Sequence, residues 1–271
     1  MQNDKEYTIG SLFSGIGGIE LGFEQAGFKT EWFVECEQFC KEILKKRFPS
    51  TKIYGDVTEI DWNKVPKVDI LTGGFPCQDI SNAGKKAGIE GERSSLWKHY
   101  CEAIRVLRPK IAFIENVSAL IGRGLNIVLA DLTSIGYDAE WYCLPASSVG
   151  ANHQRERIFV IAYPVQNGFN FNNFQDWKQR EDYMDWEQIS KKNNQERLQF
   201  ISWIEQNGKL QQIPEDMATG EWGYWSNEPR LGRVADGIPN RVDRIASLGN
   251  AVVPQVAELF AEAIKRNGGG L

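Results

Sequence analysis

The sequence has few of the residues that bind structural metal ions or build disulfide frameworks. Its 271 residues include two histidines and five cysteines. Cys36 and Cys40 lie four positions apart, but no second pair of metal-ligand residues accompanies them, so a zinc site is not expected. An odd number of cysteines without a tight spacing is typical of proteins in a reducing cytosol. We therefore expect a cytoplasmic protein that binds no metal.

Long apolar segments and an excess of positive charge are also missing. No uninterrupted apolar run reaches the roughly 18 residues that a membrane-spanning helix needs, so no membrane span is expected. The N-terminal residues are polar and of mixed charge, unlike those of a secretory signal. The net charge of −5 argues against bulk attraction to nucleic acid. Any binding to nucleic acid would need a local basic cleft.

What the sequence does contain is a regular alternation of strand-like and helix-like segments over residues 7–162. This rhythm predicts an α/β fold with a doubly wound, mostly parallel sheet. The last two predicted strands have no helix between them and could form an antiparallel pair at the edge of the sheet. Strands are expected at 7–13, 30–35, 52–54, 68–72, 111–115, 139–144 and 157–162, and helices at 18–26, 37–48, 95–107 and 125–135.

The composition changes at Pro164. Asn and Gln supply 18 of the 77 residues in 164–240, and five of the nine tryptophans lie there. This segment is expected to be a small separate domain or an insertion, and the alternative is a partly disordered, amide-rich spacer. A helical pattern returns at 251–265. We therefore divide the chain into a domain at 1–163, a small segment at 164–240 and a C-terminal helical part at 241–271.

The loop at residues 73–78 (Gly-Gly-Phe-Pro-Cys-Gln) is the most informative part of the sequence. It follows the apolar strand predicted at 68–72, so Cys77 is expected where open α/β sheets place their chemistry, at the carboxyl end of a strand. Pro76 stiffens the turn because its ring fixes φ. A thiol presented in this way is a candidate nucleophile. The alternative is a buried structural cysteine.

A second loop, residues 13–18 (Phe-Ser-Gly-Ile-Gly-Gly), joins the first strand to the first helix. It does not complete the dinucleotide fingerprint, because Glu20 stands in place of the third glycine. Glu35 lies 20 residues after Gly15 at a strand end, where a carboxylate can bind ribose hydroxyls. Asp56 follows the third strand and is placed to meet an adenine. Each feature alone also fits a plain turn or a solvated charge, but together they indicate an adenosine-type site without a pyrophosphate cradle.

Three further charged residues stand at the ends of later strands. Glu115 ends an apolar strand, so burial would raise its pKa and make it a proton donor, unless it only caps a helix. Arg155 and Arg157 precede the last strand and point the same way, since they are two residues apart on an extended segment. They could fork onto a base carbonyl or a phosphate, or form ordinary surface salt bridges.

Five motifs in order resemble those of the DNA cytosine methyltransferases that modify carbon 5. They are residues 13–18 (cofactor turn), 74–78 (nucleophile loop), 115–117 (acid motif), 155–157 (arginine motif) and 249–254 (terminal block, whose helix packs beside the cofactor turn). The resemblance spans residues 7–265 and leaves only the middle segment unmatched.

The chain departs from the family pattern in three places. His153 stands where the family often has glutamine, the segment after the arginine motif is short, and residues 230–244 lack the usual spacing of the ninth motif. These departures bear on target recognition and little on catalysis.

The resemblance implies a methyltransferase fold and a set of catalytic residues. By this resemblance Cys77 attacks carbon 6 of cytosine, and Glu115 protonates or hydrogen-bonds ring N3. Arg155 holds the cytosine O2, and Arg157 steadies the Cys77 loop and Glu115. The methyl donor is S-adenosylmethionine, held by Phe13, Gly15, Gly17, Glu35, Asp56, Leu96 and Asn250.

The resemblance also implies the partner and the setting. The substrate is double-stranded DNA with the target base flipped out of the stack, and residues 164–240 are expected to contact the bases. The protein is expected to be a monomer in the cytoplasm of a bacterial or phage-infected cell. Two alternatives stay open: a tRNA cytosine-5 methyltransferase of the same fold, and a catalytically idle DNA-binding protein or repressor.

Overall fold

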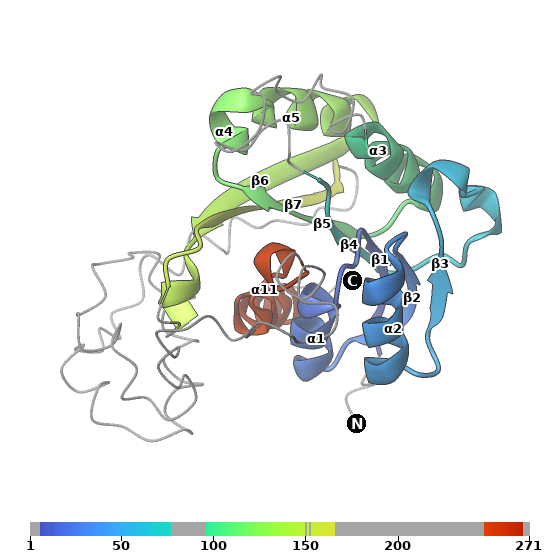
Figure 1. Ribbon diagram of the computed structural model, residues 1–271. Helices are drawn as coiled ribbons and strands as arrows, with labels where there is room; N and C mark the ends of the chain where they lie inside the picture. Colours follow the sequence, from blue (N-terminus) through green and yellow to red (C-terminus); the bar gives the residue numbers. More distant parts are fainter. Residues whose placement is uncertain (1–5, 77–95, 150, 152, 166–246, 268–271) are drawn as a thin grey trace, which may run out of the picture.

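A mixed sheet of seven strands, in the order β3-β2-β1-β4-β5-β7-β6, forms the centre of the protein (Figure 1). The computed structural model describes residues 6–76, 96–149, 151, 153–165 and 247–267. Within them the strands are β1 (Thr8–Leu12), β2 (Lys29–Val34), β3 (Lys52–Tyr54), β4 (Ile70–Gly74), β5 (Ile111–Val117), β6 (Tyr137–Leu144) and β7 (Arg157–Pro164).

The first five strands run parallel, and β7 pairs antiparallel with both β5 and β6. The predicted doubly wound α/β fold and the predicted antiparallel pair are therefore confirmed. The second strand of this pair, β7, lies beside β5, so β7 is inside the sheet and β6 is at its edge. Seven of the eight residues of β7 are buried, whereas β6 is half-exposed. An interior position suits the more apolar strand, and an edge position suits the more polar one.

The helices cover both faces of the sheet (Figure 1). One face carries α1 (Gly18–Gln25), α2 (Gln38–Arg47) and α11 (Pro254–Asn267). The other carries α3 (Leu96–Leu107), α4 (Leu120–Arg123) and α5 (Leu125–Ser134). The sequence pattern missed α4, because four residues are too few for a helical period to show. No helix in the described ranges is long and apolar enough to cross a bilayer.

The fourth strand extends two residues further than the sequence indicated. We expected it at 68–72, but β4 continues through Gly74, which pairs with Glu115 on β5. A Cβ at Gly74 would lie 2.5 Å from Oε2 of Glu115, so any larger residue at this position would require the Glu115 side chain to shift. The loop toward Cys77 therefore begins at Phe75. Cys77 itself lies outside the described residues.

The C-terminal helix packs against the first helix. A Cβ at Gly22 of α1 would clash with the carbonyl oxygen of Pro254 and lie 2.7 Å from the amide nitrogen of Glu258. Pro254 begins α11, as suits a residue without an N–H in the first turn. The apolar face predicted for 251–265 is buried here, as Phe260 illustrates by packing on Phe113 of the sheet. This contact brings the terminal segment to the turn between β1 and α1.

Candidate active site

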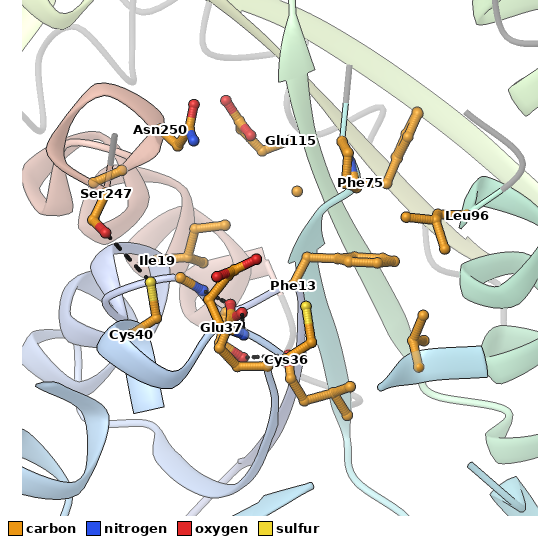
Figure 2. A pocket seen from close by; sticks show the side chains of 18 of the residues that line it. Phe13, Ile19, Cys36, Glu37, Cys40, Phe75, Leu96, Glu115, Ser247 and Asn250 are labelled. Carbon is orange, nitrogen blue, oxygen red and sulfur yellow. Dashed lines mark hydrogen bonds between the residues drawn. The ribbon is translucent and has the colours of Figure 1, made fainter. Parts of the chain in front are cut away.

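A cavity of about 610 Å³ opens where strands β1 to β5 end and β7 begins. Its size is within the range of small-molecule sites. Figure 2 shows side chains from both ends of the chain around it. Of the site residues predicted from the sequence, those lining it are Phe13, Gly15, Glu35, Asp56, Leu96, Glu115, Arg157 and Asn250.

The turn between β1 and α1 forms one wall of this cavity. Phe13 has φ of 53°, an uncommon conformation for a side chain larger than glycine. Gly15 has φ of 54° and lines the cavity. Gly17 does not line it, since a Cβ there would point at Leu44 and Phe48, 2.9–3.0 Å away. Gly17 therefore allows α2 to pack on the turn, and its predicted contact with a cofactor stays a prediction.

Glu35 closes this turn by accepting two backbone hydrogen bonds. The amide of Gly15 donates to Oε2 at 2.7 Å, and the amide of Glu37 donates to Oε1 at 2.8 Å. Glu35 is only 7% exposed. Burial raises its pKa above the ordinary range, and the backbone hydrogen bonds oppose that rise. The carboxylate is thus fixed in orientation at the cavity wall.

The remaining residues predicted to hold a cofactor come from three separate elements. Oδ1 of Asp56 accepts from the amide and hydroxyl of Thr58, at 2.9 and 2.8 Å, and these bonds lower the pKa of Asp56. Leu96 is the first residue of α3, and Asn250 precedes α11. Figure 2 shows Leu96 and Asn250 on different sides of the same cavity.

Glu115 lies at the end of β5 and is 9% exposed. Burial raises its pKa from 4.5 to about 7, and the positive charges of Arg157 and Arg155 oppose that rise. Nε of Arg157 lies 3.2 Å from Oε1 of Glu115. The structure therefore brings the predicted acid and one predicted arginine together, with the pKa of the acid raised to about 7. Their catalytic roles remain predictions.

Arg155 points to a different partner. Its Nη2 donates to the carbonyl oxygens of Gly249 and Ala251, both at 2.6 Å. Arg155 is not among the described residues that line the cavity. The predicted contact of Arg155 with a cytosine O2 stays a prediction, and the observed bonds connect the arginine motif with the terminal block.

Several lining residues were missed by sequence reasoning. Asn116 donates from Nδ2 to the carbonyl oxygen of Phe75, at 3.1 Å, and so ties the end of β5 to the start of the Cys77 loop. The only indication of Asn116 in the sequence was its position directly after Glu115. Sγ of Cys40 lies 3.5 Å from Oγ of Ser247 at the cavity edge. No local signal exists for that pair, because 207 positions separate its members.

The chemical groups of the cavity fit S-adenosylmethionine. The oriented carboxylate of Glu35 can accept hydrogen bonds from ribose hydroxyls, and the Phe13 and Leu96 side chains offer apolar surface for a flat base. Within the described ranges, no group of three or more acidic, cysteine or histidine side chains is arranged to hold a metal ion.

Several known proteins resemble this chain in sequence or in fold. Residues 7–230 match the sequence model of the C-5 cytosine-specific DNA methylases. The chain is 40% identical over 160 residues to the Type II methyltransferase M2.BsuMI of Bacillus subtilis, covering 56% of this chain and 41% of that protein. It is 34% identical over 167 residues to M.NgoFVII of Neisseria gonorrhoeae, covering 59% and 45%. The matched region thus spans less than half the length of each relative.

A solved structure of similar size shares the fold. The methyltransferase EhMeth of Entamoeba histolytica superposes with a TM-score of 0.61 over 97% of this chain and 99% of that chain, at 18% sequence identity. At this identity the likeness speaks for the fold alone.

Proposed function

We propose that this chain, which belongs to the C-5 cytosine-specific DNA methylase family, transfers a methyl group from S-adenosylmethionine to carbon 5 of cytosine in DNA. The observation that carries the proposal is Glu115, a buried acid with a pKa raised to about 7 that lines the same cavity as the Gly15 turn. A proton donor for a base and a turn suited to an adenosine-type cofactor thus share one cavity.

The chemistry begins with Cys77, which follows the cavity-lining residue Pro76 in the sequence. Its thiolate attacks carbon 6, so a sulfur–carbon bond forms and electron density moves toward carbon 5 and N3. Glu115 gives its proton to N3 and prevents charge from accumulating there. Arg157, paired with Glu115, stabilises the carboxylate left behind. Carbon 5 then has the electron density it needs to react with a methyl donor.

The release step restores the base and the enzyme. After carbon 5 has been methylated, a solvent base takes its proton, the electrons of that bond form the double bond between carbons 5 and 6, and the bond between Cys77 and carbon 6 breaks to return the thiolate. N3 returns its proton to Glu115. S-adenosylmethionine, when bound, supplies the methyl group, and we assign its binding to Phe13, Gly15, Glu35, Asp56, Leu96 and Asn250, with Gly17 shaping the turn.

Carbon 6 is inaccessible in a stacked duplex, so the target base has to be flipped out, at a cost of roughly a few kcal/mol. We assign the compensating contacts with the DNA, and the choice of target sequence, to residues 164–240. Residues 1–163 and 241–271 would form the catalytic part, and the enzyme would act as a monomer.

Covalent capture tests the proposal. Fluorine at carbon 5 cannot leave as a cation, so duplex DNA with 5-fluorocytosine at the target should trap the enzyme after methyl transfer. We expect an adduct that survives denaturing electrophoresis, requires S-adenosylmethionine and disappears in Cys77→Ala. Cys143→Ala is the matched control, because Cys143 lies on β6 away from the cavity. Glu115→Gln should form the adduct much more slowly.

The outcomes separate the alternatives. An adduct that persists in Cys77→Ala, or the lack of any adduct with active wild-type enzyme, contradicts the assignment of the nucleophile. Capture of fluorinated tRNA but not of DNA would keep the chemistry and overturn the choice of polymer. Binding of DNA without methyl transfer by wild-type protein would identify an idle binding protein.

A further inference from the structure

Arg155, in the arginine motif, forms hydrogen bonds with the protein backbone. Nη2 of Arg155 donates to the carbonyl oxygens of Gly249 and Ala251, both at 2.6 Å, across 94 and 96 positions of sequence. Guanidinium donors on fixed acceptors form strong, directional hydrogen bonds. Two bonds from one nitrogen to alternate carbonyls therefore fix the course of the backbone at residues 249–251.

The segment held in this way is a wall of the cavity. Asn250 lies between the two bonded carbonyls and lines the cavity, as do Ala251 and Val252. Figure 2 shows Asn250 on the same cavity as Glu115 and Phe13. Beyond Val252 the chain enters α11, which is fixed by packing on α1. Arg155 therefore attaches this segment to the protein at residues 249 and 251, upstream of the attachment through α11.

The backbone conformation of Arg155 indicates that the surrounding contacts hold this residue in place. Its φ of 41° lies in the left-handed region, which residues with side chains adopt only where surrounding contacts impose it. Arg155 is half-buried and electrostatically coupled to Glu115 and Arg157. Its guanidinium therefore bonds the terminal block, while its charge acts on the proposed proton donor.

We propose that Arg155 is a positioning residue that holds Asn250 in place for the cofactor before any DNA is bound. This inference rests on the proposed binding of S-adenosylmethionine in this cavity. It differs from a role on the target base, because a contact with cytosine O2 would leave cofactor binding to the free enzyme unchanged.

Calorimetric titration of the full-length, DNA-free protein with S-adenosylhomocysteine tests the inference. Arg155→Met keeps the apolar stem and removes the donors, so the dissociation constant should rise about tenfold, the equivalent of one charge-assisted hydrogen bond. Arg155→Lys retains donors on a shorter side chain, so its dissociation constant should lie between those of the wild type and Arg155→Met. In a double variant with Asn250→Ala, the two effects should not add.

Arg108→Met is the matched control. Arg108 also has a left-handed φ, of 54°, and its Nη1 also donates to a backbone carbonyl, that of Ile135 at 2.7 Å. It does not line the cavity. Its variant should bind S-adenosylhomocysteine within about twofold of wild type. If Arg155→Met matches Arg108→Met, or if its effect adds fully to that of Asn250→Ala, the inference is overturned.

Two further results keep the test decisive. If wild-type protein does not bind S-adenosylhomocysteine, the proposed function fails rather than the role of Arg155. If Arg155→Met does not fold, hydrogen exchange of the wild type gives the answer. Adding S-adenosylhomocysteine should then protect peptides 153–160 and 247–253 together, and protection confined to 247–253 contradicts the coupling.

Discussion

Nε of Arg157 lies 3.2 Å from Oε1 of Glu115, and the pair joins the start of β7 to the end of β5. Burial raises the pKa of Glu115 to about 7, while the arginine favours the ionised form. The two influences leave an acid that can both give and take a proton near neutral pH. The pH behaviour of the protein should follow from this pair.

We expect the rate of methyl transfer at saturating substrates to fall as the pH rises above about 7, because Glu115 then loses the proton that N3 needs. Arg157→Gln removes a charge that favours the carboxylate, so the pKa of Glu115 should rise and the descending limb should move to higher pH. Single-turnover pH–rate profiles measure this. Arg105→Gln is the control, since Arg105 pairs with Glu102 on the surface of α3. Coincident profiles for Arg157→Gln and wild type would contradict the assignment.

Glu115 should also make stability depend on pH. Its pKa in the folded protein is raised from 4.5 to about 7, so the native state holds the proton more tightly than the unfolded state. The resulting stabilisation is fully present below about pH 4.5 and is lost as the pH rises through about 7. Glu115→Gln lacks this dependence. Between about pH 5 and about pH 8, the variant should gain roughly 2–3 kcal/mol relative to wild type.

Urea unfolding of both proteins at the two pH values gives this difference. The pH-independent cost of leaving Arg157 without its carboxylate cancels when each protein is compared with itself. A gap between the two proteins that does not change with pH would mean that Glu115 is ionised throughout this range.

Glu35→Ala should weaken S-adenosylmethionine binding by about 1.5–3 kcal/mol, the range for hydrogen bonds to a charged group. The variant loses the acceptor expected to meet the ribose and also the bond that orders Gly15. Calorimetry on the folded protein measures the change. Glu31→Ala is the control, because Glu31 lies on the same strand and pairs with Lys29 on the surface. Unchanged affinity in folded Glu35→Ala would remove Glu35 from the cofactor site.

Gly22→Ala should destabilise the protein by about 1–3 kcal/mol, as overpacking does in a tight interface. The added methyl group would clash with backbone atoms of α11, at Pro254 and Glu258, rather than with a side chain that can turn away. The free energy of unfolding in urea measures the effect. Gly122→Ala should be close to neutral, because its Cβ would meet no atom within 4 Å. Equal stability of the two variants would show that α11 can shift away from α1.

The spacing of residues in the sequence was enough to predict which residues at strand ends line the cavity. Gly15 and Glu35 are separated by one helix and one strand, α1 and β2, and they meet directly in a 2.7 Å hydrogen bond. Glu115 follows an unbroken apolar strand, and its burial and raised pKa follow from that position. In a parallel sheet the carboxyl ends of strands gather at one edge, so the order of elements predicts which residues share a cavity.

Tertiary structure decided what depends on packing between distant segments. Gly74 belongs to β4 because it pairs with Glu115 of β5, and β7 lies inside the sheet because it pairs with both β5 and β6. The partners of Arg155 lie 94 and 96 positions away. The hydrophobic periodicity of the sequence predicts which face of a helix or strand is apolar. It does not predict which remote carbonyl or side chain will contact a given group. That choice is made only when α11 packs on α1 and brings the end of the chain to the turn where it began.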